Sequence, residues 1–415
     1  MTPARILRTY VALTVLATFA SSFIWGINTL FLLDAGLSVT QAFAANAFFT
    51  AGQVLFEVPT GVVADTWGRR VSYLLGAATL FGSTLFYLAM WRMHGPFWAW
   101  GLSSVLLGLG FTFFSGATEA WLVDGLKATR YQGTLEAAFA RGQMAQGAGM
   151  LIGTVAGGAI AQATNLGVPY ALRAVALVLT FLVALIWMRD VGFEPKRGAS
   201  VLGAMRDVLR ASIHHGLRNP PVRWVMLSGI FGGGVAIYGF YAMQPYLLEL
   251  KRARGSYAIA GFAAALVAAA QIGGGFIVPR VGRLFRRRTT TLLFATAASA
   301  ATLLLMGLVP RFFAVLVLLT LWAVFFALSI PIRQAFLNGI IPSAQRATVL
   351  SSDNLLTSSG GVIVQPALGK VADLWGWPGS YAVASAIEIL AVPFLLLARR
   401  QRAASDPIDA HARRG

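Results

Sequence analysis

The sequence contains no cysteine, and only 12% of its 415 residues are charged. The absence of cysteine excludes disulfide bonds, thiolate catalysis and cysteine-ligated metal centres. A soluble protein carries about a quarter charged residues, and half that fraction cannot cover a surface that faces water. With 57% apolar residues and a mean hydropathy of +0.70, the chain is also too apolar to be disordered. These features favour a protein embedded in a membrane.

Catalytic signatures are also scarce. The four histidines fall in predicted loops or tails, at His94, His214, His215 and His411. The sequence has neither a Gly-x-Ser-x-Gly nucleophile motif nor a Gly-x-x-x-x-Gly-Lys-Ser/Thr phosphate loop. We therefore expect no enzymatic activity, no ATP hydrolysis, no metal ion and no other cofactor.

Long apolar runs, in contrast, occur throughout the chain. A membrane-spanning helix needs about 20 mostly apolar residues, and runs bounded by charges, glycine or proline define twelve such segments. The expected spans are 10–33, 41–63, 71–92, 97–123, 138–161, 168–188, 222–248, 257–279, 289–309, 312–332, 349–371 and 379–397. They predict an all-α integral membrane fold with twelve transmembrane helices.

The longest connector divides the spans into two sets of six. We expect a six-helix bundle at 1–188, a cytoplasmic linker at 189–221, a second bundle at 222–398 and a cytoplasmic tail at 399–415. Basic residues recur every four positions in the linker, opposite an apolar side, at Arg206, Arg210, His214 and Arg218. This pattern is typical of a helix on the inner membrane surface; a flexible basic linker is the alternative.

Basic residues are distributed unevenly between alternate connectors. With a cytoplasmic N-terminus, the inner side holds 26 of the 33 Lys and Arg residues, and the outer side holds seven. Because basic loops remain cytoplasmic, we predict a multi-pass protein of the cell (inner) membrane with both termini in the cytoplasm. The net charge of +18 then reflects contact with anionic membrane lipid rather than nucleic acid. The outer cluster Lys251, Arg252 and Arg254 is an unexplained exception.

The two halves repeat each other. The run from Gly61 to Arg70 shares its Gly, Gly and Arg spacing with the run from Gly275 to Leu284, 214 positions later. Span five ends in Gly-Ala-Ile-Ala-Gln162 and span eleven in Gly-Lys-Val-Ala-Asp373, 211 positions apart. Duplicated six-helix halves are a transporter architecture.

These motifs resemble the major facilitator superfamily, and the resemblance covers essentially the whole chain. The family's loop between helices two and three reads Gly-x-x-x-Asp-x-x-Gly-Arg-Arg/Lys, which matches Gly61, Asp65, Gly68, Arg69 and Arg70. The segments 56–60 and 115–124 are similar to a bacterial branch often assigned to efflux. The resemblance implies two pseudo-symmetric bundles, a monomer and a small-molecule substrate.

The resemblance also implies a conformational latch. In it, Arg69 or Arg70 bonds Asp124. Asp65 can pair with basic neighbours or face the N-terminus of another helix, which the resemblance suggests is the one that begins near Thr348. The glycines permit a tight turn at this loop, and a helix dipole favours an anion at its N-terminus. The alternative is that these charges only set the topology.

Three acidic residues lie at depth in predicted spans. A buried carboxylate is costly unless it is paired or neutral, so such a group can carry a proton. We expect Glu57 and Glu119 to be proton-coupling groups, with a structural hydrogen bond as the alternative. Glu388 lies on a helix that the family places outside the central cavity, so a structural role is favoured there.

The resemblance implies a central cavity lined by spans one, two, four and five facing seven, eight, ten and eleven. Uncharged amides among aromatic residues on these spans suit an amphiphilic or weakly charged ligand. The candidate cavity residues are Trp25, Asn28, Gln53, Gln143, Gln146, Tyr238, Tyr241, Gln244, Gln271, Asn354 and Gln365. Each amide taken alone is also compatible with helix–helix hydrogen bonding.

The sequence departs from proton-coupled exporters at two places. Many of them carry an arginine in span four, which is absent from 105–115, and a proline among the span-five glycines, which is absent around Gly149, Gly153 and Gly157. The glycine spacing still suits close helix packing. The sequence therefore predicts a secondary transporter, with proton-coupled efflux favoured over proton-coupled uptake. A membrane-embedded receptor or enzyme is the third alternative.

Overall fold

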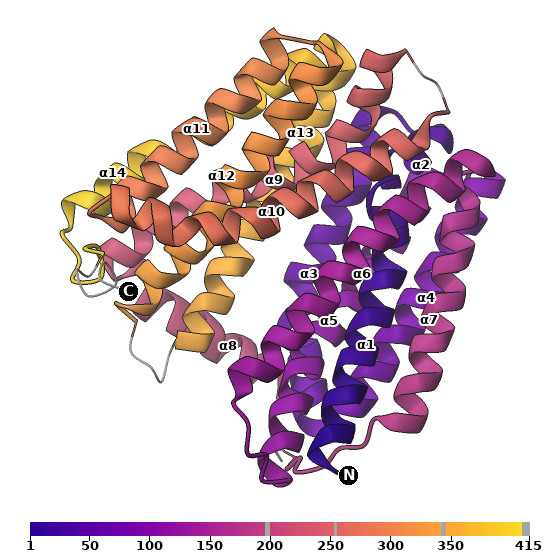
Figure 1. Ribbon diagram of the computed structural model, residues 1–415, viewed down its shortest axis with the longest axis vertical. Coiled ribbons are helices and arrows are strands. Elements are labelled where there is room, and N and C mark those ends of the chain that lie inside the picture. The colour runs from indigo at the N-terminus through magenta and orange to yellow at the C-terminus, as the bar shows by residue number, and fades with distance from the viewer. Residues whose placement is uncertain (196–199, 253–254, 342–345, 409–415) are drawn as a thin grey trace. The chain divides into compact units, whose positions relative to one another are not determined.

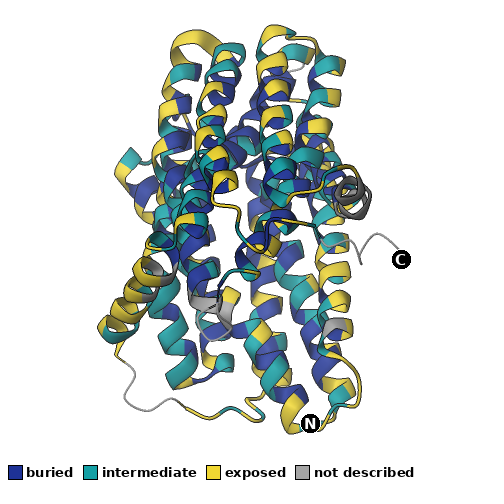
Figure 2. Cartoon of the chain, turned by 90° about the vertical axis from the view of Figure 1, so that its left-hand side faces the viewer, coloured by how far each residue is buried: buried dark blue, intermediate teal, exposed yellow. Residues whose placement is uncertain are grey.

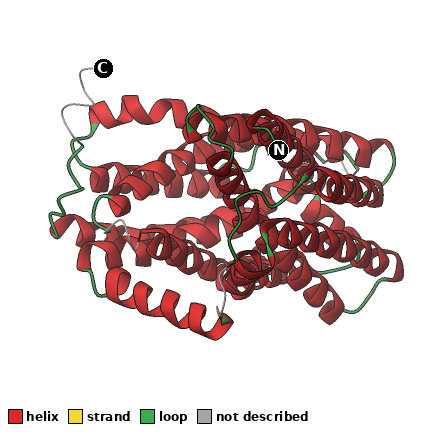
Figure 3. Cartoon of the chain, turned by 90° about the horizontal axis from the view of Figure 1, so that it is seen from below, coloured by secondary structure: helices red, strands yellow, loops and turns green. Residues whose placement is uncertain are grey.

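The computed structural model describes residues 1–195, 200–252, 255–341 and 346–408, and these residues form helices and connecting loops without a strand (Figure 3). Side chains of residues 275–283, which include the second copy of the glycine motif, lie outside this described part. Arg254 of the basic cluster also lies outside it.

The first half of the chain forms seven helices (Figure 1). Their bounds are α1 Pro3–Trp25, α2 Asn28–Asp34, α3 Val39–Trp67, α4 Arg69–Met93, α5 Phe97–Ala128, α6 Leu135–Ala163 and α7 Gly167–Trp187. The expected first span is thus interrupted: the backbone departs from helical geometry at Ile27, with φ −132° and ψ 1°, before α2 begins. Apolar periodicity alone does not reveal this break, because the residues on both sides are apolar.

The second half begins after a short linker helix. The linker contains α8 Val201–Ala211, followed by a π-helical turn, η1 Ser212–Leu217. The long helices are α9 Pro220–Lys251, α10 Tyr257–Leu284, α11 Arg288–Leu308, α12 Phe312–Asn338, α13 Arg346–Ile389 and α14 Ala391–Arg400. Gly376, at φ 70° and ψ 178°, separates α13 into two helical parts. The last expected span is likewise divided, between the end of α13 and α14.

Eleven helical segments in the described residues are long and apolar enough to cross a membrane, and one of them contains the kink at Gly376. The helices therefore provide the twelve expected crossings. Large apolar side chains remain exposed on the long helices, for example Val175, Leu179 and Ile186 on α7. Buried and exposed residues alternate along the same helices in Figure 2. Such exposed apolar faces are expected where lipid is the solvent.

The chain forms two compact units. Unit 1 contains 1–37, 48–205 and 255–265, and unit 2 contains 38–47, 206–254 and 266–415. The first turns of α3 therefore pack in unit 2, and the first turns of α10 pack in unit 1. In unit 1, Phe31 stacks on Tyr170 at 3.9 Å between ring centroids. In unit 2, Tyr246 and Tyr381 are fully buried with their rings 5.4 Å apart.

Candidate functional site

A charged cluster lies where α3 passes into α4, within unit 1. Gly68 makes the turn with φ 109°, a conformation that favours glycine. Nη1 of Arg69 lies 2.6 Å from Oδ1 of Asp65, and its Nε lies 3.7 Å from Oδ2 of Asp124 on α5. A Cβ on Gly61 would meet no described atom within 4 Å, so no contact requires glycine there. Arg69 thus connects three helices, while the latch role and the contact of Asp65 with the eleventh span stay predictions.

The neighbouring arginine contacts a residue that the sequence analysis did not single out. The backbone N–H of Arg70 donates to Oδ1 of Asp190 at 3.0 Å, and its Nη2 donates to the carbonyl of Leu185 at 2.6 Å. Asp190 follows α7 and therefore caps the N-terminus of α4, where unpaired N–H groups favour an anion. The sequence signal for this cap was an acidic residue, Asp190, two positions after the end of the predicted span 168–188.

Asp190 gives a pH-dependent prediction. Asp190 is exposed as a whole residue, but partial desolvation of its carboxyl raises the pKa of that group, and the contacts with Arg70 and Arg69 lower the pKa by a smaller amount. The stability that this group contributes is therefore present at low pH and lost as the pH rises through the raised pKa. The parent should lose thermal stability relative to Asp190→Asn as the pH rises from about 4. Glu194→Gln, at an exposed neighbour, is the control; a pH-independent difference between parent and Asp190→Asn would contradict the prediction.

Unit 2 contains a similar cap. The backbone N–H of Thr289 at the start of α11 donates to Oδ1 of Asp406 at 2.9 Å, and Asp406 is buried. The guanidinium of Arg288 also donates to the carbonyls of Ser405 and Pro407. Part of the predicted tail therefore packs on the second half. In each half, an acidic residue after the sixth predicted span caps the third.

The two predicted proton-coupling residues occupy different environments in unit 1. Glu57 is half-buried on α3, and the Ser115 hydroxyl on α5 donates to its Oε1 at a long 3.4 Å. Glu119 is one turn further along α5 and is exposed. It lines a cavity of about 270 Å³, together with Ser115. The structure thus places both carboxylates next to Ser115, with Glu119 on the cavity wall itself.

This cavity brings together four of the predicted substrate-contacting residues. Trp25 from α1, Gln53 from α3, and Gln143 and Gln146 from α6 all line it. Aromatic and hydroxyl side chains complete the wall, including those of Tyr10, Tyr73, Phe111, Phe114 and Thr118. The wall therefore combines amide groups, a carboxylate and aromatic rings, which suits a solute with both polar and apolar parts.

A second cavity, of about 290 Å³, lies within unit 2, and Asn354 is the predicted residue that lines it. Its wall contains an ion pair that the sequence analysis missed. Nε and Nη2 of Arg333 on α12 lie 3.0 and 2.5 Å from the two carboxylate oxygens of Asp353 on α13. Arg333 also donates to the Ser228 hydroxyl on α9 at 3.2 Å. The sequence did contain a signal for this pair: Arg333 follows the predicted span 312–332, and Asp353 lies near the start of the next predicted span, 349–371.

The remaining predicted cavity residues lie elsewhere. Asn28 is buried and accepts a hydrogen bond from Tyr170 at 2.8 Å. Tyr238 is buried and donates to Ser380 at 2.5 Å. Gln244 and Gln365 are fully buried, whereas Tyr241 and Gln271 are half-buried. None of these six residues lines either cavity described above.

Two further helix caps are formed by Gln162 and Asp373, which are equivalent positions of the repeat, 211 residues apart. In unit 2, the Asp373 carboxylate on α13 accepts from the backbone N–H groups of Val39 and Thr40 at 3.2 and 2.9 Å. In unit 1, the side-chain oxygen of Gln162 on α6 accepts from the N–H of Ala258 at 3.1 Å. Each side chain thus satisfies N–H groups at the start of a helix, α3 and α10 respectively.

Arg173, from α7, lies close to residue 111 in the fourth predicted span, where the segment 105–115 contains no arginine. Arg173 on α7 is fully buried, and its Nε donates to Thr84 on α4 at 3.0 Å. Its guanidinium carbon lies 5.9 Å from the centre of the Phe111 ring on α5, within the range of a cation–π contact. Arg173 is one of the seven basic residues that the predicted topology places toward the outer side, and it lies within α7 rather than in a connector.

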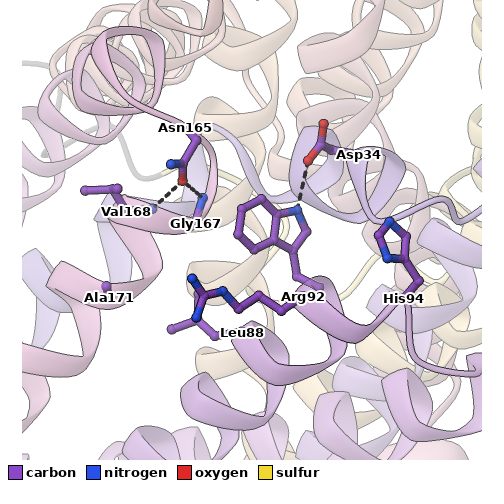
Figure 4. Close-up of a pocket in the computed structure, with 9 residues that line it drawn as sticks. Asp34, Leu88, Arg92, His94, Asn165, Gly167, Val168 and Ala171 are labelled. Atoms are coloured by element: carbon purple, nitrogen blue, oxygen red, sulfur yellow. Dashed lines mark hydrogen bonds between the residues drawn. The ribbon is translucent and has the colours of Figure 1, made fainter.

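A third cavity, of about 640 Å³, contains none of the predicted site residues (Figure 4). Two of its polar residues bond within the wall: the indole N–H of Trp91 donates to Asp34 at 2.8 Å, and Asn165 accepts from the N–H groups of Gly167 and Val168. Arg92 and His94 also line the cavity. Because none of the predicted site residues lies there, we base no function on this cavity.

Comparison with known proteins agrees with this arrangement. The chain resembles the nucleoside transporter NupG with a TM-score of 0.76 and 13% identity, over 94% of this chain and 98% of that one. It resembles the POT family transporter PepTSo with a TM-score of 0.74 and 12% identity, over 97% and 98%. A bacterial homologue of the human lysosomal transporter Spinster gives 0.72 and 17%, over 97% and 98%. A search of curated protein sequences gave no match.

At these identities, the solved structures show a shared fold only. The family is shown by the sequence: the family model described as Major Facilitator Superfamily matches residues 10–287 and 245–414. Its motif residues Asp65 and Arg69 form the charged cluster in unit 1. This multi-pass, all-α membrane protein therefore belongs to the Major Facilitator Superfamily.

Proposed function

We propose that the protein is a secondary active transporter that exports a small organic solute in exchange for protons, by alternating access of two six-helix halves. The observation that carries this proposal is the cavity of unit 1, where Glu119 and four polar or aromatic predicted contacts share one wall, and Glu57 adjoins it through Ser115. The half-buried carboxylate of Glu57 can exchange a proton, and the amides and rings of the cavity wall can bind a solute.

The remaining assignments complete the proposal. Halves at 1–188 and 222–398 move about a shared substrate path, joined by the linker at 189–221. The protein is a monomer in the inner membrane, with both termini cytoplasmic. The cluster of Asp65, Arg69 and Asp124 acts as a latch that breaks when the transporter changes conformation.

Counterflow in proteoliposomes tests the transport assignment. Vesicles loaded with a candidate solute should accumulate the labelled solute transiently without ATP, since exchange needs no net driving force. A receptor or an enzyme would give no exchange. The direction of an imposed pH gradient that accelerates net movement then separates export by antiport from uptake by symport, the alternative function.

Glu57→Gln should abolish proton-driven transport while solute binding is retained, because the amide occupies the same volume but cannot release a proton. Net flux under a pH gradient should fall by at least tenfold, with counterflow preserved. The matched control is Glu249→Gln, at an exposed acidic residue near the end of α9, which should transport normally. An unchanged pH dependence of flux in Glu57→Gln would remove Glu57 from the coupling mechanism.

A further inference from the structure

The cavity of unit 2 contains a carboxylate that the proposed function does not use. Glu388, near the end of α13, lines this cavity and is only 7% exposed. Its Oε2 has no hydrogen-bond partner within the described part of the chain, while the hydroxyl of Ser299 on α11 is a hydrogen-bonding neighbour of this carboxyl. Buried polar atoms are normally satisfied, so the unsatisfied carboxylate oxygen indicates a place for a donor.

The charges around the cavity leave Glu388 without a counter-ion. The other charged residues that line it are Arg333 and Asp353, and their guanidinium and carboxylate groups are bonded to each other at 3.0 and 2.5 Å. Because that pair is neutral as a unit, an ionised Glu388 gives the cavity one net negative charge. Burying such a charge is unfavourable unless the carboxylate takes up a proton or a cation accompanies it.

The size and wall of the cavity decide what kind of cation fits. Its volume of about 290 Å³ greatly exceeds the roughly 30 Å³ that one water molecule occupies. The wall includes Phe325, Phe326, Leu292 and Leu395, which provide apolar and aromatic contact. A hard metal ion instead needs about six oxygen ligands, and the described residues contain no group of three or more acidic or histidine side chains able to hold a metal.

We propose that this cavity binds a small organic molecule that carries a protonated amine. The ammonium group donates hydrogen bonds to Glu388 and Ser299, and the apolar body packs against Phe325 and Phe326, with which a cation also interacts favourably. The site lies wholly among helices of the second half, α9 and α11 to α14. The proposal concerns binding, so it holds for either direction of transport and does not require Glu57 or Glu119.

Calorimetric titration of the full chain in detergent at pH 7 tests the site, with phenethylammonium chloride as the probe and phenethyl alcohol as its uncharged analogue. The ammonium ion should bind at least tenfold more tightly than the alcohol. Glu388→Gln should weaken ammonium binding by about 10- to 100-fold, the range expected for loss of a charged hydrogen bond. Ser299→Ala should weaken it by a smaller factor, and Glu249→Gln should leave it unchanged.

A second measurement keeps the test decisive if Glu388→Gln does not fold. A hydrophobic carbodiimide should modify Glu388 in the parent protein, as detected by peptide mass spectrometry, and phenethylammonium should slow this modification whereas phenethyl alcohol should not. Equal binding of ammonium and alcohol, or unchanged binding by folded Glu388→Gln, would overturn the proposal. Displacement of the probe by sodium chloride but not by choline chloride would assign the site to a metal cation and overturn it as well.

Discussion

Arg333→Gln should destabilise the folded protein by about 3–5 kcal/mol, because it leaves the Asp353 carboxylate buried without its partner. Asp353 is 5% exposed, and both of its oxygens are bonded to the Arg333 guanidinium in the parent. Asp353→Asn should also be harmful, since the Arg333 guanidinium, with 19% of its side chain exposed, then lacks a counter-charge. Denaturant-dependent unfolding in a fixed detergent measures the change in the free energy of unfolding.

The double variant Arg333→Met with Asp353→Leu removes both charges at once. Comparing its stability with that of the single variants distinguishes the effect of losing the ion pair from the effect of burying one unpaired charge. Replacing a buried pair by apolar residues of similar size is often close to neutral, so this variant should recover most of the stability. Arg311→Gln, at an exposed arginine before the other end of α12, is the control and should change stability by less than about 0.5 kcal/mol. Single and double effects that simply add would show that the two side chains are not coupled.

The fold was predictable because its signal repeats throughout the chain. Each span must satisfy its own backbone hydrogen bonds in lipid, so length and hydropathy locate the helices without tertiary information. The break at Ile27 was not predictable in this way. Apolar residues continue on both sides of this position, so hydropathy does not mark it.

The contacts of the charged cluster were only partly predictable. Asp65 and Arg69 are four residues apart, one on each side of the turn at Gly68, so their pairing is local in the sequence. The cap formed by Asp190 is 120 residues from Arg70 in sequence, and it depends on how α7 ends beside α4. The pairing of Arg333 with Asp353 likewise depends on the register between α12 and α13.

The repeat carried more structural information than the sequence analysis used. Gln162 and Asp373 were recognised as equivalent positions, and both turn out to cap the start of a long helix, α10 and α3 respectively. Their chemistry differs, because a neutral amide caps one helix and a carboxylate caps the other. A duplicated position can therefore preserve a backbone contact while its charge changes.

Gly149, Gly153 and Gly157 form a glycine ridge on α6. Among alanine substitutions on this ridge, Gly157→Ala should be the most harmful, with a loss of about 1–3 kcal/mol or more in the free energy of unfolding. A Cβ at this position would fall on the carbonyl oxygen of Phe23 in α1, and backbone atoms cannot move aside without separating the two helices. Gly149→Ala, two turns earlier on the same ridge, is the matched control. Its Cβ would lie 3.4 Å from the Cβ of Thr18, an ordinary contact distance.

The two alanine variants have opposite expected signs. At Gly149 the added methyl group fits, and the lower backbone entropy of the unfolded chain should leave stability unchanged or raise it by up to about 1 kcal/mol. At Gly157 the same entropic gain is outweighed by the clash with α1. Because the helical propensity change is identical at both sites, the difference between the variants isolates the close approach of α1 and α6. Equal stabilities would mean that the ridge does not hold these helices in contact, and the cavity lined by Trp25 from α1 and Gln146 from α6 would then lack the rigid wall that solute binding requires.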